Sequence, residues 1–432
     1  MKNLLFMLGL LFLPCAAQKR VCVEKLAPAV DSIAGYGIRM GAFPGCQVVV
    51  AQHGRVVLSK CYGYHSDRVH RKVQPTDLYD LASVTKTTAT VLAVMKLYDE
   101  GRLRLDDRAS RYLPFLRTAD KSGITIGDLL FHQSGFPMTI PFYEAAVDSS
   151  SFAPPLTQKQ PDERHPNQLE EHLFMSHFSY LPGTFSPVED ATHHQHVYDG
   201  MWFADRYADT LRARVARVEL GPRRYSYSDI GFIVLQWVVE AITGQSLSDY
   251  VEQSFYLPMG ARHTLFLPRR RYGRQQIVPT VQNDVLRGLR EMQGYTQDEV
   301  ASFMGGVAGE AGLFSTAQDL ALIYQMYLNK GELNGRRYLS QSTCRLFETT
   351  QSDISRRGLG FDRPDAHDAA NFLPLSTFGH SGFTGTEVWV DPDNQLVYVF
   401  LTNRVSPVPW NWKYNRLDIF GRFKRALYDS LE

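Results

Sequence analysis

The sequence predicts an α+β fold in which strands from both ends of the chain form one antiparallel sheet flanked by helices. Residues 46–61 alternate between apolar and polar on both sides of His53-Gly54, and residues 386–403 alternate around a turn at 392–394. Alternation around a short turn is typical of a β-hairpin. Between the hairpins the apolar residues follow a helical period, so we expect an inserted, mostly helical lobe.

Helices are expected along the whole chain and are recognised by apolar residues at helical spacing. The predicted ranges are 23–40, 84–100, 230–242, a short helix after 246, 316–328 and 412–431. Gly244 lies just beyond the third range, as glycine often does at a helix C-terminus. Ser246 with Asp249, and Thr316 with Asp319, have the spacing of capping boxes. These signals predict where the helices begin and end.

Residues 1–17 have the composition of a secretory signal peptide. Lys2 precedes an apolar run over 4–13, and small residues follow at Ala16 and Ala17. The run is too short to cross a bilayer. We therefore expect an exported protein, periplasmic or secreted, with 18–432 as a single domain and no transmembrane segment. A lipid anchor on Cys15 is an alternative.

Residues 141–222 differ in composition from the rest of the chain. They are rich in Ser, Pro, His and charged residues and show weak periodicity. We interpret them as a long insertion with some helix over 198–218, covering one side of the domain. His193, His194 and His196 are the nearest approach to a metal-binding cluster, but they lie in a polar, irregular stretch. The sequence therefore predicts no metal and no other cofactor.

The overall charge limits the kinds of partner. Among 432 residues, 46 are Lys or Arg and 45 are Asp or Glu, so the formal net charge is +1. Binding to nucleic acid or to an acidic membrane surface usually requires a basic excess. We expect a small-molecule or peptide substrate and no nucleic acid. The oligomeric state is not predicted.

The four cysteines outside the signal are Cys22, Cys46, Cys61 and Cys344. If His53-Gly54 forms the hairpin turn, the numbers of two residues that face each other add up to the sum of 53 and 54. Cys46 then faces Cys61. An exported protein can form a cross-strand disulfide there. Two small thiols packed in the core are an equally good interpretation.

Ser83 and Lys86 lie three positions apart at the start of a predicted helix. Positions with this spacing share a helix face, so the amine can reach the hydroxyl. Burial and nearby positive charge can lower the pKa of a lysine until it acts as a base. Free N–H groups at the helix N-terminus also favour an oxyanion. The alternative is that Ser83 is an ordinary N-cap.

A second serine, Ser381, lies in the sequence Gly-His-Ser-Gly-Phe, which resembles a nucleophile elbow. The fifth residue of that motif should be glycine, and this chain has Phe383. An elbow serine also needs a later acidic residue and then a later histidine. No histidine follows His380. This sequence therefore excludes an α/β-hydrolase centred on Ser381.

Three short motifs occur in the order Ser83-Val84-Thr85-Lys86, Tyr227-Ser228-Asp229 and His380-Ser381-Gly382. Together they resemble the motif set of the serine β-lactamase and penicillin-binding protein family. The closest branch is that of class C β-lactamases, D-alanyl-D-alanine carboxypeptidases and related esterases. Sequences around 79–107, 124–137, 306–321 and 378–392 resemble it as well. The resemblance implies a β-lactamase/DD-peptidase-like fold.

The resemblance also implies roles for individual residues. Ser83 would attack a carbonyl and form an acyl-enzyme, while Lys86 and Tyr227 would share the work of general base. The backbone N–H groups of Ser83 and Phe383 would form the oxyanion hole. The residues expected to contact substrate are Asp229, His380, Ser381 and Gly382. Glu310, in a glycine-rich loop, receives no role.

Two residues depart from the pattern of many relatives. His380 stands where lysine is common, as in D-alanyl carboxypeptidase and D-aminopeptidase variants, and Asp229 stands where asparagine is common. A carboxylate cannot donate a hydrogen bond unless it is protonated. The leading hypothesis is an exported serine hydrolase of D-amino acid peptides, with a β-lactam or an ester as other substrates. The alternatives are a carboxylesterase and a penicillin- or peptidoglycan-binding module without turnover.

Overall fold

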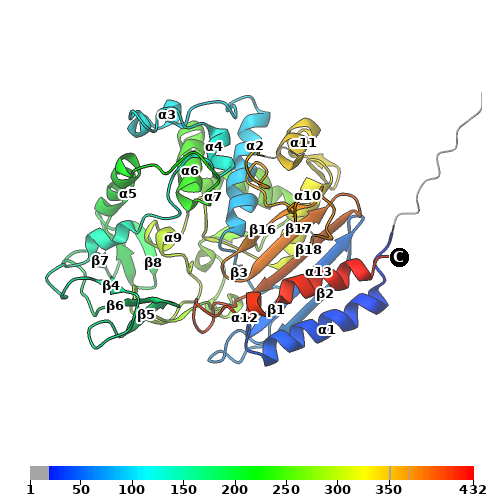
Figure 1. Ribbon diagram of the computed structural model, residues 1–432, viewed down its shortest axis with the longest axis horizontal. Helices are drawn as coiled ribbons and strands as arrows, with labels where there is room; N and C mark the ends of the chain where they lie inside the picture. The colour runs from blue at the N-terminus through cyan, green and yellow to red at the C-terminus, as the bar shows by residue number, and fades with distance from the viewer. Residues whose placement is uncertain (1–18, 350–351, 369) are drawn as a thin grey trace, which may run out of the picture.

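The computed structural model describes residues 19–349, 352–368 and 370–432. The predicted signal segment, including Cys15, lies outside the described residues. In Figure 1 a twisted sheet and two terminal helices occupy one end of the molecule, and a lobe of helices and short strands occupies the other. This arrangement agrees with the predicted α+β fold.

The large sheet is antiparallel and has the strand order β16-β17-β18-β1-β2. Its strands are β1 (Gly45–Gln52), β2 (Arg55–Gly63), β16 (Phe378–Gly382), β17 (Thr386–Asp391) and β18 (Leu396–Thr402). Strand β1 pairs with β18 along its length. The two predicted hairpins are therefore confirmed, and they join through their central strands.

Alternate residues of β1 serve two different cores because side chains alternate across a sheet. Val48 and Val50 pack beneath α1 (Val23–Arg39) and α13 (Ile419–Asp429), the two terminal helices. Val49 packs into the larger core on the opposite face. Every residue of β1 is consequently buried.

The closing helix differs from the prediction of one continuous helix over 412–431. It consists of α12 (Lys413–Arg416) and α13, with a break between them. The break lies at Asp418, whose φ of 49° is left-handed and cannot continue a right-handed helix.

Most of the helices lie between the two hairpins in the sequence. They are α2 (Val91–Asp99), α3 (Ala109–Tyr112), α4 (Ile126–Leu130), α5 (Arg206–Arg217), α6 (Asp229–Thr243), α7 (Leu247–Val251), α8 (Leu257–Met259), α9 (Glu299–Phe303), α10 (Ala317–Leu328) and α11 (Gln341–Thr349). The predicted ends of α6, α7 and α10 are confirmed. Gly244 has a left-handed φ of 70°, and the Ser246 and Thr316 hydroxyls each accept a hydrogen bond from the N–H three residues later.

Short strands accompany these helices. They are β3 (Tyr79–Asp80), β4 (Thr157–Gln158), β5 (Asn167–Glu170), β6 (Leu173–Met175), β7 (Phe185–Ser186), β8 (Gln195–Tyr198), β9 (Met201–Phe203), β10 (Leu265–Phe266), β11 (Gln282–Asp284), β12 (Leu289–Glu291), β13 (Leu313–Ser315), β14 (Glu332–Leu333) and β15 (Arg336–Arg337). Strands β10, β13 and β3 form a small sheet beside the start of α2.

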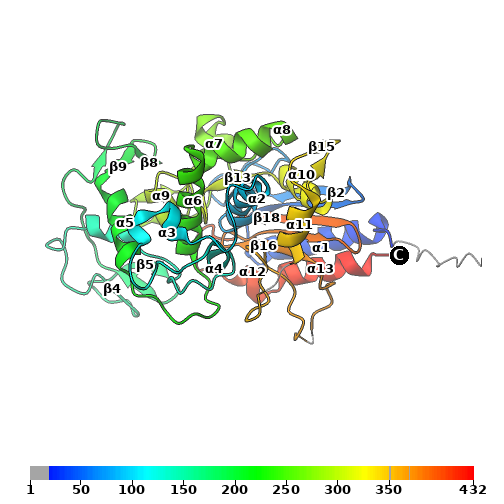
Figure 2. The same ribbon diagram turned by 90° about the horizontal axis from the view of Figure 1, so that it is seen from above.

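The segment 141–222 lies at the end of the molecule opposite the terminal helices (Figures 1 and 2). It contains α5 and two three-stranded sheets, β4-β6-β5 and β7-β9-β8. The predicted helix over 198–218 is shorter than expected, because Tyr198 ends strand β8 and α5 begins at Arg206. Weak periodicity in this segment reflects strands too short to show alternation.

The predicted pairing of Cys46 with Cys61 is wrong. A bulge between Val50 and Ala51 shifts the register of the hairpin, so Cys46 lies opposite Tyr62 instead. A shift of one residue moves a side chain to the other face of the sheet. Cys46 therefore packs beneath the terminal helices, and Cys61 packs against the larger core. Both thiols are free, as are Cys22 and Cys344.

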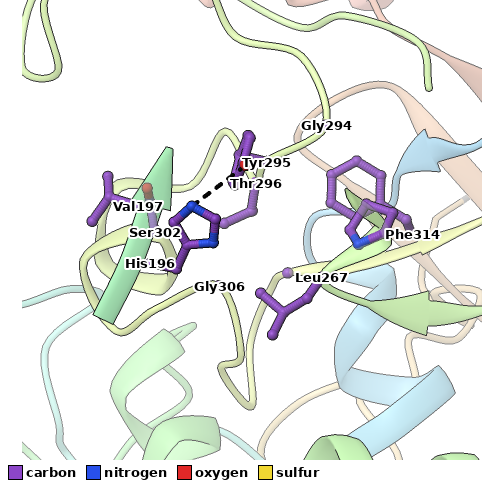
Figure 3. Close-up of a pocket in the computed structure, with 11 residues that line it drawn as sticks. His196, Val197, Leu267, Gly294, Tyr295, Thr296, Ser302, Gly306 and Phe314 are labelled. Atoms are coloured by element: carbon purple, nitrogen blue, oxygen red, sulfur yellow. Dashed lines mark hydrogen bonds between the residues drawn. The ribbon is translucent and has the colours of Figure 1, made fainter. Parts of the chain in front are cut away.

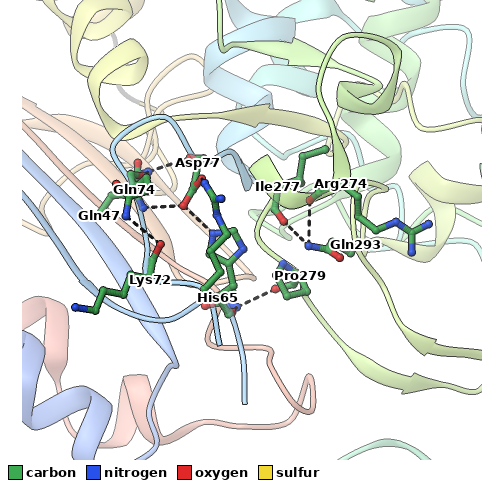
Figure 4. Close-up of polar contacts among 11 residues, drawn as sticks. Gln47, His65, Lys72, Gln74, Asp77, Arg274, Ile277, Pro279 and Gln293 are labelled. Carbon is green, nitrogen blue, oxygen red and sulfur yellow. Dashed lines mark hydrogen bonds and ion pairs between the residues drawn. The ribbon is translucent and has the colours of Figure 1, made fainter. Parts of the chain in front are cut away.

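A buried polar network ties the sheet to the segment that leads into β3 (Figure 4). Gln47 of β1 donates to the backbone carbonyls of Gln74 and Asp77, at 2.7 and 2.9 Å. The Asp77 carboxylate in turn contacts His65 Nε2 at 2.7 Å, and both side chains are fully buried. These buried contacts hold the segment between β2 and β3 against the sheet.

None of the described helices is by itself long and apolar enough to cross a bilayer. Helix α6 together with residues 247–259 has the necessary length and composition, but the two are bent by 73°. Ten consecutive residues of α6, from Ile230 to Val239, are buried in the protein core.

Candidate functional site

Ser83 lies on a sharp turn between strand β3 and the helix that follows. Ala82 has a φ of 45°, which is unfavourable for a residue with a Cβ atom. The Asp80 carboxylate accepts the Ala82 N–H at 3.0 Å and the Gln297 N–H at 2.7 Å. Burial raises the pKa of Asp80 to about 6 although both hydrogen bonds lower it. Asp80 therefore holds the strained turn, a role that sequence reasoning missed.

The helix after Ser83 does not begin as a regular α-helix. Residues Lys86–Thr90 form a π-helical turn before α2 starts at Val91. The N-cap interpretation of Ser83 is wrong, because no backbone N–H of a described residue donates to its Oγ. That oxygen accepts a hydrogen bond from Lys86 Nζ at 2.9 Å. π-Helical turns are frequent at functional sites.

The Lys86 amine is fully buried and contacts residues from three parts of the chain. Besides Ser83, its Nζ donates to the Glu310 carbonyl at 3.2 Å and lies 2.6 Å from Asp229 Oδ1. Burial alone would lower the pKa of Lys86, but the charge of Asp229 and the Tyr227 phenol outweigh it and raise this pKa. The expected lowering is therefore wrong for the free protein, and Lys86 is a cation.

Tyr227 covers the other side of the same amine. Lys86 Nζ lies 4.9 Å from the centroid of the Tyr227 ring, and the Arg357 guanidinium lies 5.2 Å from it. His132 stacks on the ring at 4.5 Å. Burial raises the pKa of Tyr227, whereas the two cations oppose that change. Tyr227 is therefore a neutral phenol between two positive charges.

Asp229 is the first residue of α6, but it does not cap the helix. The N-cap is Ser228, whose Oγ accepts the Gly231 N–H at 3.2 Å. The contact of Asp229 with Lys86 is an ion pair without the angles of a hydrogen bond. Asp229 therefore stabilises the positive charge of the Lys86 amine.

His380 lies in the middle of β16 and is buried. Arg357 Nη1 contacts His380 Nε2 at 3.1 Å, and His380 Nδ1 contacts the Ser381 carbonyl oxygen at 2.7 Å. Because a guanidinium has no acceptor, Nε2 must accept and Nδ1 must carry the proton. Burial and the nearby cations hold the pKa of His380 well below its ordinary value. His380 is therefore neutral.

Arg357 and His132 belong to the site but were not predicted. Arg357 is buried and forms an ion pair with Asp362 at 3.5 Å. His132 Nδ1 accepts the Ser228 N–H at 3.0 Å and so positions the second motif. His132 lies within a flanking sequence that resembles the family, which is the signal that could have found it. Arg357 has no comparable local signal.

The end of β16 packs directly against the turn that carries Ser83. Thr386 and Thr384 donate to the carbonyls of Leu81 and Asp80, at 2.9 and 2.7 Å. Phe383 lies in the turn after β16 rather than on the strand, and it is 41% exposed. Within the described residues, the N–H groups of Ser83 and Phe383 have no acceptor. Two free donors on adjoining segments fit an oxyanion hole.

Gly382 permits this close approach, and its replacement by alanine is expected to impair both folding and activity. An added Cβ would lie 2.3 Å from the Leu81 carbonyl and 2.2 Å from Thr386 Oγ1. Overpacking of this kind typically costs about 1–3 kcal/mol. Thermal unfolding measures the effect on stability, and the rate at which a fluorescent penicillin labels Ser83 measures the effect on activity. Gly123→Ala is the control, since nothing lies within 4 Å of its added Cβ and its φ is not left-handed. Unchanged stability and labelling in Gly382→Ala would contradict the packing argument.

Ser83, Ser381 and Gly382 are partly exposed, whereas Lys86 and His380 are buried. The nucleophile position therefore faces solvent while its partners lie beneath it. Neither of the two cavities described below is lined by Ser83.

Glu310 contributes its backbone carbonyl to the site, where it accepts a hydrogen bond from Lys86, while its carboxyl group is buried. Both carboxyl oxygens are buried and have no partner among the described residues. Burial and the nearby carboxylates of Asp298 and Asp229 hold its pKa well above the ordinary value. Glu310 is therefore an uncharged acid close to Lys86.

The three histidines of the insertion do not converge. His193 contacts Asp190 at 3.0 Å, His194 contacts Asp205, and His196 stacks on Trp202 at 4.1 Å. Across the described ranges, no group of three or more His, Cys, Asp or Glu side chains is arranged to hold a metal ion.

Comparisons with known proteins agree with this geometry. The family model described as Beta-lactamase matches residues 30–415. The Escherichia coli K12 protein named "Putative D-alanyl-D-alanine carboxypeptidase" is 29% identical over 415 residues, covering 89% of this chain and 84% of that protein. The N-acetylmuramyl-L-alanine amidase of Bacillus subtilis 168 is 30% identical over 403 residues, covering 87% and 80%.

Solved structures share the fold at lower sequence identity. EstCE1, described as a hydrolase with promiscuous acyltransferase activity, aligns with a TM-score of 0.63 at 19% identity, covering 94% of this chain and 99% of that chain. A penicillin-binding protein homologue from Caulobacter crescentus aligns with a TM-score of 0.62 at 18% identity, covering 95% and 99%. A family model matching most of the sequence, with motifs that meet in space, leads to one conclusion. The chain belongs to the beta-lactamase family and is a serine hydrolase.

Proposed function

We propose that this serine hydrolase forms an acyl-enzyme on Ser83 and hydrolyses amide bonds in peptides that contain D-amino acids. The supporting observation is that one buried amine, Lys86 Nζ, contacts Ser83 Oγ at 2.9 Å and lies 4.9 Å from the Tyr227 ring. Tyr227 belongs to a motif that is far from Ser83 and Lys86 in the sequence. A nucleophile within hydrogen-bond reach of its activating groups is the signature of covalent catalysis.

In the proposed reaction, the pair formed by Lys86 and Tyr227 first loses one proton to solvent. Ser83 Oγ then bonds to the substrate carbonyl carbon while its proton passes to the deprotonated pair. The carbonyl oxygen becomes an oxyanion and accepts hydrogen bonds from the Ser83 and Phe383 N–H groups. The amine then leaves with the proton from that pair. Water attacks the resulting ester by the same route and releases the acid and the free serine.

The substrate class is inferred from the relatives and from the predicted export. Two curated relatives are named a D-alanyl-D-alanine carboxypeptidase and an N-acetylmuramyl-L-alanine amidase, which are both hydrolases of amide bonds. The signal-like segment 1–17 would bring the protein to the periplasm or the medium. We therefore place D-amino acid peptides first and β-lactams second.

A carboxylesterase is the alternative function with the same residues. A family VIII carboxylesterase shares the fold with a TM-score of 0.61 at 18% identity. The partly exposed Ser83 would accept an ester as well as an amide. A binding module that acylates without turnover is the other alternative, and it predicts labelling without product.

Labelling with a fluorescent penicillin and a fluorophosphonate, followed by peptide mapping, tests the acyl-enzyme. We expect the label on Ser83 and none in Ser83→Ala. Turnover of a D-Ala-D-Ala peptide, a chromogenic cephalosporin and a short-chain ester then separates the functions. The peptide should have the highest kcat/KM. Labelling retained in Ser83→Ala would refute the assignment, and ester hydrolysis alone would favour the carboxylesterase.

A further inference from the structure

A cavity of about 400 Å³ lies where the insertion meets the turn between β11 and β12. Its lining residues are Asn167, Ser176, His177, Phe178, Tyr180, Phe185, Met201, Val285, Leu286, Arg287 and Gly288. Sites for small ligands typically measure 300–1,000 Å³. A second cavity, beside His196 and Phe314, measures about 10 Å³ (Figure 3). That volume suits a single water molecule. Of these two cavities in the described residues, the larger one has room for a substrate group.

Three aromatic side chains form one wall of the larger cavity. The Phe178 and Tyr180 rings meet edge to face at 5.1 Å, and the Tyr180 and Phe185 rings do so at 5.0 Å. The Tyr180 hydroxyl donates to the Leu286 carbonyl at 2.8 Å and ties this row to the opposite wall. The row is therefore a fixed apolar surface.

Two buried polar side chains in the lining have unused hydrogen-bonding capacity. Ser176 is 4% exposed, and its hydroxyl has no partner among the described residues. Arg287 is 3% exposed and uses Nε and Nη2 to bind Asp284, while its Nη1 has no described partner. Unsatisfied buried polar groups are costly in native proteins. A ligand with polar groups would satisfy them.

The lining carries little net charge. The Arg287 guanidinium is neutralised by the Asp284 carboxylate, and both side chains are almost completely buried. Asn167 adds an uncharged amide that contacts His177 at 3.4 Å. The cavity therefore fits an uncharged group with one apolar face and a polar edge.

Hydrogen bonds connect this cavity to the turn that carries Ser83. Arg287 Nη2 donates to the Gln297 carbonyl at 3.1 Å, and the Gln297 N–H donates to the Asp80 carboxylate at 2.7 Å. The same carboxylate accepts the N–H of Ala82, the neighbour of Ser83. These contacts link the lining of the cavity to the turn that carries the nucleophile.

We propose that the cavity is a subsite for an amino-sugar ring attached to the peptide substrate. The C–H face of the ring would lie on the aromatic row, and its hydroxyl and acetamido groups would bond to Ser176, Arg287 and Asn167. This proposal rests on the proposed function, because it assigns the second half of the same substrate. It gives the 141–222 insertion a role in specificity.

The test compares one peptide with and without an N-acetylglucosaminyl-N-acetylmuramyl group. We expect the wild type to have a kcat/KM about tenfold higher for the sugar-bearing peptide, since a tenfold change corresponds to one well-placed hydrogen bond. Ser176→Ala and Phe178→Ala should each reduce that ratio toward one and leave kcat/KM for the bare peptide unchanged. Phe372→Ala is the matched control, because Phe372 is exposed and packs on Tyr428.

Direct binding separates failure of the subsite from failure of the proposed function. The free disaccharide is titrated against Ser83→Ala and against the double variants that add Ser176→Ala or Phe178→Ala, with binding followed by NMR. We expect binding that both additional substitutions weaken, even if no peptide is hydrolysed. Absence of binding, or a ratio near one in the wild type, would overturn the subsite. Thermal unfolding of every variant verifies folding, and Phe178→Ala keeps the test valid if Ser176→Ala does not fold.

Discussion

Replacing Lys86 with methionine is expected to slow acylation of Ser83 by about 10²–10⁴-fold, the usual contribution of a positioned acid–base group. Methionine keeps the length of the side chain but removes the amine that contacts Ser83 Oγ at 2.9 Å. The cation that opposes the raised pKa of Tyr227 is lost at the same time. The rate of labelling by a fluorescent penicillin measures the effect, with Ser83→Ala as the zero reference.

The matched control for this change is Lys96→Met. Lys96 lies ten residues further along the same helix and forms an ion pair with Glu100 at 3.3 Å on the protein surface. Surface pairs contribute about 0–1 kcal/mol, so the acylation rate should not change. Lys86→Met removes one partner of a pair with Asp229, and its thermal unfolding must therefore be measured as well. A folded Lys86→Met protein with the wild-type rate would exclude Lys86 as part of the base.

The sheet and the meeting of the three motifs were predictable because the signals were strong. The strand around Val48 is rich in valine and ends at the His53-Gly54 turn, which predicts a hairpin. Two such hairpins, one near each end of the chain, are compatible with few sheet topologies. Ser83, Tyr227 and His380 occur in a recognisable order, and the structure brings their motifs together around Lys86. The resemblance to a known motif set was thus sufficient to predict that these motifs lie close together.

Local geometry was less predictable. The bulge at Val50 and Ala51, which separates Cys46 from Cys61, leaves no mark on the pattern of alternation because both faces of the strand are buried. The break at Asp418 likewise occurs within a continuous helical pattern. In each case tertiary packing, rather than sequence preference, decides the backbone conformation.

The direction of the Lys86 pKa was predicted wrongly for an electrostatic reason. Burial and neighbouring cations lower the pKa of a lysine, but a carboxylate within about 4–6 Å raises it. The sequence did not reveal that Asp229 Oδ1 lies 2.6 Å from Lys86 Nζ. Arg357 escaped prediction for a similar reason, since its contacts with His380 and the Tyr227 ring exist only in the folded chain.

Replacing Asp229 with asparagine is expected to move the acid limb of the acylation pH profile to lower pH. The charge of Asp229 raises the pKa of both Lys86 and Tyr227 and so favours their protonated forms. Catalysis needs one proton removed from this pair, and the rate rises with pH until that proton is lost. Removing the charge therefore lowers the pKa of both groups.

The same argument fixes the sign at a single pH. At a pH below the pKa of the Lys86–Tyr227 pair, the deprotonated and active fraction rises tenfold for each unit by which that pKa falls. Asp229→Asn should therefore be acylated faster than the wild type near neutrality. Asp249→Asn is the matched control, because Asp249 is also an acidic residue in the first turn of a helix but is exposed and bonded to Ser246. Its pH profile should match that of the wild type. If Asp229→Asn instead slows acylation at every pH without moving the limb, the carboxylate itself takes part in the proton transfer, and its role as a modulator of Lys86 is wrong.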